Sequence, residues 1–287
     1  MRPAHVIEIV TPKKVVLNGL WLGPRKPKRV VIWVHGLGST MFSKLFIVDK
    51  LVDKTTAVLA FNNRGHDKVA NVQTVSGKRI QGGAAHEVFT DCADDIQGAV
   101  NFAKKSGFKN IFLAGHSTGC QKSIYYASKQ VDRNVRGIIL LAPISDWAAE
   151  VHLKGKRKVE KVAKVARTLM ARGGGRTLLL GGPWGIWVDV LDAQRFLSLY
   201  TPESVEEIFS YAQPKRKPKT LKSVKIPILV LLAGKDEYGD RPARKIGDWF
   251  AEHLKIGDKI AVVPKVGHSF KGAEKKVAGL IRGFMKS

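Results

Sequence analysis

Cysteine, acidic residues and long apolar runs are all scarce in this sequence. Cys92 and Cys120 lack the paired spacing of a metal site, and a chain of 287 residues can bury a core that folds without disulfides. Both thiols therefore suit small core positions in a reducing compartment, and we expect a cytoplasmic protein. No stretch approaches the roughly 18 apolar residues of a membrane-spanning helix, and the N-terminus lacks the apolar segment of a signal peptide, so we expect no membrane span.

The shortage of acidic residues makes the chain strongly basic. It contains 24 Asp and Glu residues against 49 Lys and Arg residues, a formal net charge of +25. The excess gathers in residues 154–176, where Glu160 is the single acid, and in residues 214–225, which contain none. Such a surface can meet nucleic acid, anionic lipid or an acidic substrate. No nucleic-acid-binding motif accompanies it, so we interpret it as a solvated surface and expect no specific nucleic-acid partner.

The overall composition is that of an ordinary globular protein. Apolar residues make up 44% of the chain and charged residues 25%, which excludes the disordered and fibrous classes. Continuous apolar runs of the kind found in strands buried on both faces are “RVVIWVHG”, “TAVLAFNNRG”, “NIFLAGHS”, “VRGIILLAP”, “PILVLLAG” and “DKIAVVPKVG”. Ahead of them, “HVIEIV” and “KVVLNGLWL” predict an antiparallel pair of edge strands.

Helix-like segments separate these strands. One begins at Asp91 or Asp94, both favourable residues for a helix start, and ends at Gly107. Another follows directly after “NIFLA”, and two more lie near the C-terminus. Strands that alternate with helices predict the α/β class, with a mostly parallel central sheet and helices on both faces.

Residues 145–225 interrupt this alternation. Apart from the ambiguous segment “TLLLGG” they hold no convincing strand, and their apolar positions from Val159 to Met170 trace one face of a helix. Thr201 followed by Pro202 predicts the start of a further helix. An insertion of this length between sheet elements commonly forms a lid over an active site.

We therefore expect two parts in the chain. Residues 1–144 and 226–287 form the core domain, and residues 145–225 form an inserted, mainly helical cap. The cap contains three tryptophans that are candidates for an acyl or aromatic pocket: Trp147, Trp184 and Trp187.

The stretch “FLAGHSTGCQKS” places a serine where a strand gives way to a helix. Ser117 lies between Gly115 and Gly119, in the pattern of a nucleophile elbow, where a sharp turn exposes the hydroxyl above the sheet. The turn leaves no room for side chains at the two flanking positions, which explains the glycines. A hydroxyl becomes an effective nucleophile only when a base removes its proton, so a histidine and an acid should follow.

Both follow in the expected order, each after a later strand. Asp236 comes directly after “PILVLLAG”, with Asp240 as an alternative acid four residues on, and His268 follows “KIAVVP”. Upstream, the glycine-rich loop after the first buried strand can present the backbone N–H of Leu37 to an oxyanion. The N–H of Thr118, next to the predicted nucleophile, would complete this oxyanion hole.

Four further polar residues near these motifs are predicted to support the site rather than to react. His116 points away from the nucleophile and packs, and His35 supports the oxyanion loop. Arg64 and His66, in “NNRGHD”, brace loops. No second histidine or cysteine stands at metal-ligand spacing, so we expect no metal.

Five motifs carry a resemblance to a known family. In chain order they are “HGLGS”, “NNRGHD”, “GHSTG”, “AGKDEY” and “VGHSF”. On these the chain resembles the serine esterases of the α/β-hydrolase superfamily, from about Val30 to the C-terminus, which implies the α/β-hydrolase fold and ester hydrolysis. “FNNRGHD”, “AQRFLSLYTPE” and “GKDEY” are also similar to the branch that includes fungal siderophore-ester hydrolases, which implies ester hydrolysis but transfers no substrate.

We therefore predict a serine hydrolase that cleaves carboxylic esters through an acyl-enzyme, without metal or organic cofactor. Its predicted partner is a small-molecule ester, anionic or aromatic in character. Two kinds of alternative stay open. The same fold supports thioesterases, peptidases and acyltransferases. A ligand-binding protein of low turnover, or one that interacts through its basic surface, would retain the same residues.

Overall fold

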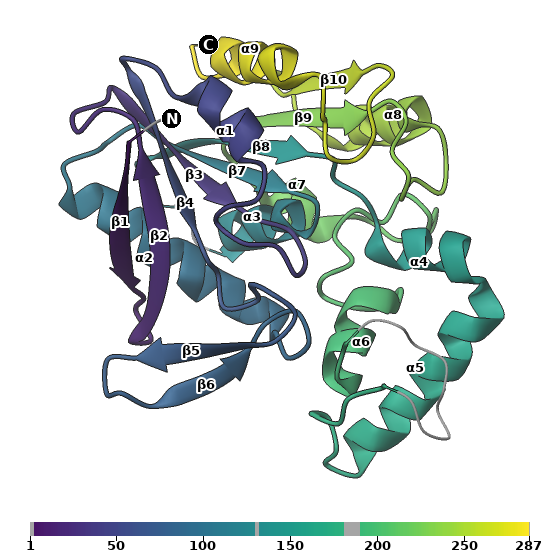
Figure 1. Cartoon of the computed structure of the whole chain (residues 1–287). Helices are drawn as coiled ribbons and strands as arrows, with labels where there is room; N and C mark the ends of the chain where they lie inside the picture. The colour runs from purple at the N-terminus through teal and green to yellow at the C-terminus, as the bar shows by residue number, and fades with distance from the viewer. Residues whose placement is uncertain (1–2, 130–131, 181–189, 287) are drawn as a thin grey trace.

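The computed structural model describes residues 3–129, 132–180 and 190–286. A central sheet runs through the molecule, with helices on both of its faces and a group of helices beyond it (Figure 1). The described strands are β1 (Ala4–Val10), β2 (Val15–Leu22), β3 (Arg29–Val34), β4 (Thr56–Phe61), β5 (Ala70–Thr74), β6 (Arg79–Gly82), β7 (Ile111–His116), β8 (Val135–Leu141), β9 (Ile228–Ala233) and β10 (Lys259–Val263).

The strand order is β10-β9-β8-β7-β3-β4-β2-β5-β6, with β1 paired to β2. From β10 to β4 every neighbouring pair is parallel, and all pairs that involve β1, β2, β5 and β6 are antiparallel. The predicted mostly parallel sheet is confirmed. Because β7 lies between β3 and β8, the carboxyl end of β7 opens beside the loops that follow its neighbours.

The prediction for the first two strands is only partly correct. β1 and β2 form the expected antiparallel pair, but β2 is not an edge strand. It pairs with β1 on one side and, at successive positions along its length, with β5 and β4 on the other. The β5–β6 hairpin that continues the sheet was not expected, because its short strands “ANVQT” and “RIQG” lack the apolar runs that mark the other strands.

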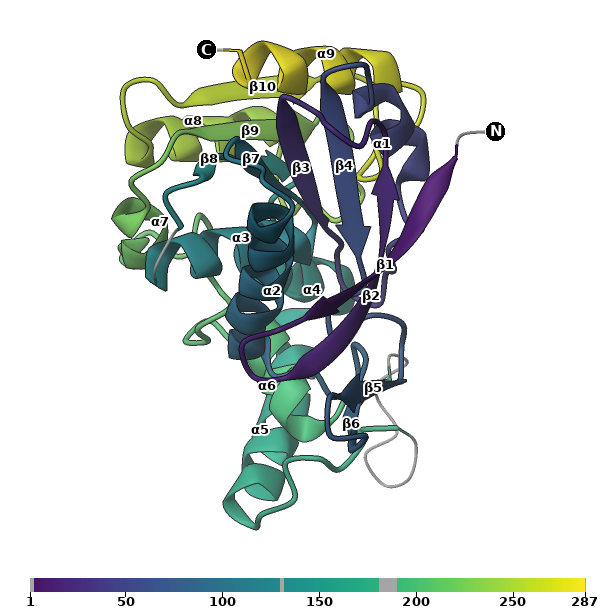
Figure 2. The same ribbon diagram turned by 90° about the vertical axis from the view of Figure 1, so that its left-hand side faces the viewer.

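Helices cover both faces of the sheet. α1 and α9 pack on one face, whereas α2, α3 and α8 pack on the other, an arrangement that Figure 2 shows from the side. The described helices are α1 (Leu45–Leu51), α2 (Cys92–Lys105), α3 (Thr118–Lys129), α4 (Asp146–Lys154), α5 (Lys156–Ala171), α6 (Ala193–Tyr200), α7 (Lys219–Ser223), α8 (Ala243–His253) and α9 (Glu274–Phe284).

Of the two residues predicted to start α2, Asp91 lies at the N-terminal cap and Asp94 lies within the first turn. The helix begins after Asp91, whose side chain makes no capping hydrogen bond and pairs with Lys13 and Arg64 instead. Asp94 lies inside the first turn, where a negative charge favours the helix dipole. The chain turns away at Gly107, whose φ of +88° suits glycine, as expected for a helix end.

Helices α4 to α7 lie between β8 and β9, in the segment predicted as an insertion, and the described residues of that segment contain no strand. We call residues 145–225 the helical insertion. It has a small core of its own, in which Val159, Val162 and Ala166 of α5 pack against Phe196 of α6. Figure 1 shows α4, α5 and α6 as a group set apart from the sheet.

The prediction of a helix start at Pro202 is wrong. α6 ends at Tyr200 and Thr201 is its C-terminal cap. The true start lies earlier, because the Asp192 side chain accepts a 2.7 Å hydrogen bond from the backbone N–H of Arg195 and caps α6 there. Pro202 follows the helix instead of beginning one.

The predicted aromatic positions of the insertion are only partly visible. Trp147 is half-buried at the start of α4 and packs against the core beside α3 and α8. It therefore holds the insertion to the core. Trp184 and Trp187 lie outside the described residues.

Candidate active site

Ser117 occupies the sharp turn between β7 and α3. Its φ is +56°, in the left-handed region that few non-glycine residues adopt, and strain of this kind is concentrated at functional sites. A Cβ on Gly115 would lie 2.2 Å from the carbonyl oxygen of Gly119, and a Cβ on Gly119 would lie 2.2 Å from the oxygen of Val34. The expectation that both flanking positions exclude a side chain is confirmed.

Asp236 and His268 are in direct contact at the carboxyl ends of β9 and β10. The Nδ1 atom of His268 lies 2.9 Å from one carboxylate oxygen of Asp236 and 3.0 Å from the other. The alternative acid, Asp240, is paired with the neighbouring Arg241 at 2.7 Å. Of the two candidate acids, the tertiary structure therefore brings Asp236 to the histidine.

Three more groups hold the backbone and ring of His268. The backbone N–H of His268 donates to Glu237 Oε2 at 2.8 Å, and the rings of Tyr238 and His116 each pack edge-on with centroids 4.9 Å away. His116 Nε2 lies 3.0 Å from the carbonyl oxygen of His268. Sequence reasoning missed Glu237 and Tyr238, although both directly follow Asp236.

His116 is a neutral hydrogen-bond donor. Burial, followed by the charge of His268, lowers the pKa of His116 to about 3. A carbonyl oxygen can only accept, so the neutral ring carries its proton on Nε2 and donates it to His268. His116 thus does more than the packing that we expected from sequence.

The loop after β3 approaches the elbow closely. A Cβ on Gly36 would lie 2.9 Å from the Cβ of Ser117, so the absence of a side chain lets this loop reach the serine. His35 braces it: Nδ1 lies 2.9 Å from the Gly36 oxygen, and Nε2 accepts a 3.2 Å hydrogen bond from the N–H of Asn63. Burial lowers the pKa of His35 to about 3, so the ring is neutral and Nδ1 donates.

A cavity of about 500 Å³ joins these elements. Ser117, His268 and Leu37 line it from the core, and Leu153 and Leu191 line it from the helical insertion. Thr118 also lines it. No hydrogen bond joins the side chains of Ser117 and His268 in the described structure, which is common in enzymes without substrate. The predicted nucleophile, base and oxyanion loop therefore share one chamber.

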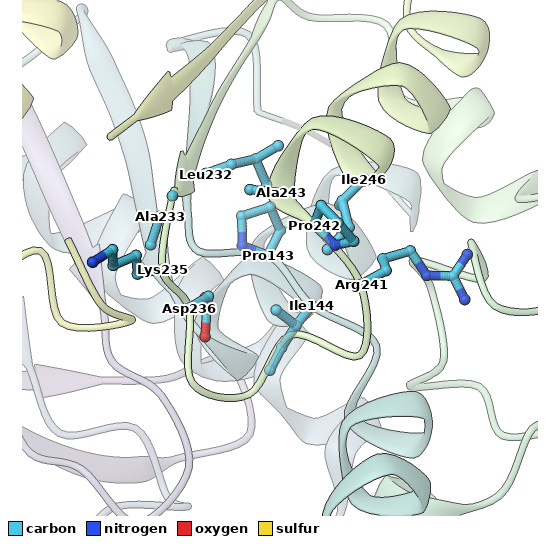
Figure 3. A pocket seen from close by; sticks show the side chains of 11 residues that line it. Pro143, Ile144, Leu232, Ala233, Lys235, Asp236, Arg241, Pro242, Ala243 and Ile246 are labelled. Carbon is cyan, nitrogen blue, oxygen red and sulfur yellow. The ribbon is translucent and has the colours of Figure 1, made fainter. Parts of the chain in front are cut away.

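A second, smaller pocket lies behind the acid. Its volume is about 170 Å³, and Figure 3 shows its wall, with the Asp236 carboxylate at the end of β9 and the Arg241 side chain extending away. Apolar side chains of Pro143, Leu232 and Ile246 form much of the lining. Neither Ser117 nor His268 contributes to it, so the larger cavity is the candidate active site.

A buried chain of charges ties the helical insertion to the helix of the elbow. Lys122 of α3 pairs with Glu87 at 2.5 Å, and the second oxygen of Glu87 pairs with Arg195 of α6 at 2.9 Å. Arg195 also binds Glu206. Both cations are 0% exposed, so every charge in the chain depends on its partners. These ion pairs could not be predicted from the spacing of residues in the sequence, because their partners lie far apart in the chain.

The predicted bracing role of Arg64 is confirmed. Its side chain pairs with Asp94 at 2.5 Å, with Asp95 at 2.7 Å and with Asp91 at 3.2 Å. These pairs join the loop after β4 to the start of α2. His66 contacts Asp67 at 2.8 Å and is not among the residues that line the larger cavity.

Within residues 3–129, 132–180 and 190–286, no cluster of three or more His, Cys, Asp or Glu side chains is arranged to bind a metal ion. In the same ranges no helix has the length and apolar character needed to span a membrane.

Comparison with known proteins places this geometry in context. A family model described as “Protein of unknown function (DUF1749)” matches residues 26–280. A putative esterase/lipase from Mycoplasma genitalium is 27% identical over 149 residues, which are 51% of this chain and 50% of the relative. The chain thus spans about half the length of that curated relative.

Two fungal structures are similar over nearly the whole chain. Siderophore hydrolase EstB from Aspergillus fumigatus superposes with a TM-score of 0.68 at 17% identity and covers 100% of this chain and 97% of its own. The α/β hydrolase GrgF from Penicillium has the same TM-score and identity, with 99% and 98% covered. These likenesses show the α/β-hydrolase fold, and the predicted fold class is confirmed.

Proposed function

This chain belongs to the DUF1749 family, whose description assigns no reaction, and we propose from the geometry of its site that it hydrolyses carboxylic esters. The observation that carries the proposal is the contact of His268 Nδ1 with the Asp236 carboxylate at 2.9 Å, on the same cavity as the elbow serine. An acid that holds one ring nitrogen leaves the other free to act as a base. The names of two similar proteins, a putative esterase/lipase and a siderophore hydrolase, support a hydrolase reaction of this class.

The proposed reaction begins when the ester carbonyl enters the cavity beside Ser117. Ser117 Oγ attacks the carbonyl carbon while His268 Nε2 accepts the hydroxyl proton, and the oxyanion is stabilised by the N–H groups of Leu37 and Thr118. His268 then gives this proton to the departing alcohol as the carbon–oxygen bond breaks. An acyl-enzyme on Ser117 remains.

The second half of the reaction releases the acid. His268 removes a proton from a water molecule, which attacks the acyl carbon, and the proton then returns to Ser117 Oγ as the ester bond to the enzyme breaks. Asp236 holds the His268 ring and stabilises its charged form throughout. Every step uses groups of this chain and water, so the mechanism requires no cofactor.

The proposal gives the helical insertion the role of a cap. Leu153 at the end of α4 and Leu191 before α6 line the same cavity as Ser117, so an acyl chain or alcohol would lie between the core and the insertion. The proposed compartment is the cytoplasm, which suits the two free, buried thiols of Cys92 and Cys120.

Covalent labelling tests the proposal without a guess about substrate. We expect incubation with a broadly reactive fluorophosphonate to add the mass of one adduct, because only an activated serine attacks phosphorus readily. Ser117→Ala should lose the adduct, and the matched control Ser106→Ala, at an exposed position after α2, should keep it. A folded protein that takes up no adduct would contradict the mechanism and favour a ligand-binding role.

The bond that is cleaved needs a separate measurement. The same groups attack thioesters and amides, and contacts in the pocket decide between them. We expect a matched ester to be hydrolysed faster than the corresponding thioester and amide when kcat/KM is compared side by side. A faster thioester would reassign the chain to the thioesterases while leaving the roles of Ser117, His268 and Asp236 in place.

A further inference from the structure

Three lysines line the catalytic cavity. Lys44 comes from the turn before α1, Lys68 from the loop after β4, and Lys154 from the end of α4 in the helical insertion. Among the residues that the structure describes, none of these ammonium groups forms an ion pair with a carboxylate. Three separate segments therefore direct cations toward the same chamber as Ser117 and His268.

Lys44 is the most unusual of the three. Its backbone is left-handed, with φ of +61°, and its side chain is half-buried, whereas Lys68 and Lys154 are exposed. Burial lowers the pKa of Lys44, and the attraction of Glu237 only partly opposes this change. Glu237 uses one carboxylate oxygen to accept the N–H of His268. The ammonium thus loses hydration without gaining a full counter-charge, and it lies over the Phe46 ring, with the centroid 6.0 Å away.

The acidic groups on the cavity wall do not balance the lysines. Within residues 3–129, 132–180 and 190–286, the acids that line the cavity are Asp146 and Glu150. Removal from water, together with the carboxylates of Glu206 and Glu207, raises the pKa of Asp146 well above its ordinary value, which favours the neutral acid. Among the described lining residues, three cationic side chains therefore face two acids, and one of these, Asp146, is shifted toward its neutral form.

We propose that the substrate is an ester that carries a carboxylate, and that Lys44 binds this carboxylate while Lys68 and Lys154 attract it to the mouth of the cavity. This inference rests on the proposed ester hydrolysis and names its substrate class. One half-buried ammonium matches the single charge of a carboxylate. A phosphate dianion usually requires several N–H donors or an arginine fork, and the described cavity lining contains no arginine.

Matched esters test the proposal directly. The monomethyl esters of succinic, glutaric and adipic acids are compared with the methyl esters of butanoic, pentanoic and hexanoic acids, and methanol release is followed by NMR. A second pair places the carboxylate on the alcohol, with 3-acetoxypropanoate against propyl acetate. We expect at least one acidic ester to exceed its neutral partner in kcat/KM by about tenfold or more, the effect of one charge-assisted contact.

Variants assign the preference to Lys44. Lys44→Met keeps the length of the side chain and removes its charge, so it should abolish the preference for the acidic ester and leave the neutral ester within about twofold. Lys44→Arg should restore part of the preference. The matched control is Lys50→Met, an exposed lysine of α1 that lies outside the cavity and pairs with Asp49. A loss in Lys50→Met equal to that in Lys44→Met would overturn the assignment.

Lys68 and Lys154 should affect the salt dependence of kcat/KM. Attraction over a distance acts on the association rate and weakens with salt. The double variant Lys68→Met, Lys154→Met should therefore reduce the salt dependence of kcat/KM for the acidic ester and leave that of the neutral ester unchanged. An unchanged salt dependence for the acidic ester would remove these two residues from the proposal.

Failure of this inference is distinguishable from failure of the proposed function. Labelling of Ser117 together with equal rates on acidic and neutral esters would overturn the carboxylate-bearing substrate and leave the ester hydrolase in place. Absence of both labelling and ester turnover would overturn both proposals.

Discussion

His116 Nε2 lies 3.0 Å from the backbone oxygen of His268, so the residue that precedes the proposed nucleophile holds the backbone of the proposed base. On the other side of the same residue, Glu237 accepts the His268 N–H at 2.8 Å. The loop of His268 is therefore anchored to both the elbow and the acid loop. Relative placement of base and nucleophile then depends on contacts outside the three proposed catalytic residues.

Replacement of His116 should reduce turnover without loss of the fold. His116→Phe keeps an aromatic ring against His268 and removes the donor to its oxygen. We expect kcat to fall about ten- to hundredfold, because small displacements of a catalytic group have effects of this size, while KM changes little. His116→Gln offers an amide donor and should recover part of kcat. Equal losses in both variants would argue against the hydrogen bond as the cause.

The two candidate acids should differ strongly in their effect on rate. Asp236→Asn preserves shape but removes the charge that orients and stabilises the His268 ring, so we expect kcat to fall by about ten-thousandfold. Asp240→Asn is the matched control, because Asp240 lies in the same loop and pairs with Arg241. Its kcat should stay within about threefold of the unmodified protein. Similar rates for the two variants would show that Asp236 is not the orienting acid.

The backbone of the elbow should tolerate no side chain at Gly115. Gly115→Ala would place a Cβ 2.2 Å from the Gly119 oxygen, so we expect destabilisation of about 3 kcal/mol or more, or failure to fold. Gly279→Ala is the control, because a Cβ there meets nothing within 4 Å and α9 should gain about 0.5–1 kcal/mol. Urea denaturation compares the two free energies of unfolding, and a stable Gly115→Ala protein would disprove this steric account.

The buried charge chain should be costly to break. Arg195→Met removes the cation between Glu87 and Glu206 and leaves their carboxylates buried, for which we expect a loss of about 3–5 kcal/mol. Arg167→Met removes an exposed partner of Glu203 and should cost less than about 1 kcal/mol. Thermal unfolding measures both. Equal shifts in Tm would mean that the chain does not hold the helical insertion to the core.

The pH dependence of stability should report Glu207. Burial raises the pKa of Glu207 from 4.5 to about 7 in the folded protein, so folding favours its protonated form. That contribution is complete below about pH 4.5 and is lost as pH rises through about 7. As pH rises from 5 to 8, the stability of Glu207→Gln relative to the unmodified protein should therefore increase, by on the order of 1–3 kcal/mol.

The measurement for Glu207 is Tm at the two pH values. Glu207→Gln keeps an oxygen that can accept from Ser145 Oγ, a 2.6 Å hydrogen bond in the unmodified protein. The exposed Glu252→Gln is the control and should leave the difference in Tm between the two pH values unchanged. If Glu207→Gln leaves that difference unchanged as well, the carboxyl does not titrate in this window.

Much of the fold could be predicted from local sequence patterns. Strands buried on both faces form continuous apolar runs, and the two elbow glycines follow from a turn only a few residues long. The wrong or missing predictions concern short or polar segments. The β5–β6 hairpin lacks an apolar run. Thr201–Pro202 has the pattern of a helix start, but α6 begins nine positions earlier, where Asp192 caps it.

The sequence by itself determined most of the elements, the elbow and the order in which serine, acid and histidine follow the strands, because each depends on residues close together in the chain. Tertiary structure decided which groups meet. The sequence favoured Asp236 over Asp240 only because it follows the strand sooner, whereas the approach of the loop after β10 brings His268 into contact with Asp236. Arg195 finds Glu87 across 108 positions, and three lysines converge on one cavity from unrelated segments. Such contacts depend on packing between segments that are distant in the chain, so they cannot be predicted from local sequence patterns.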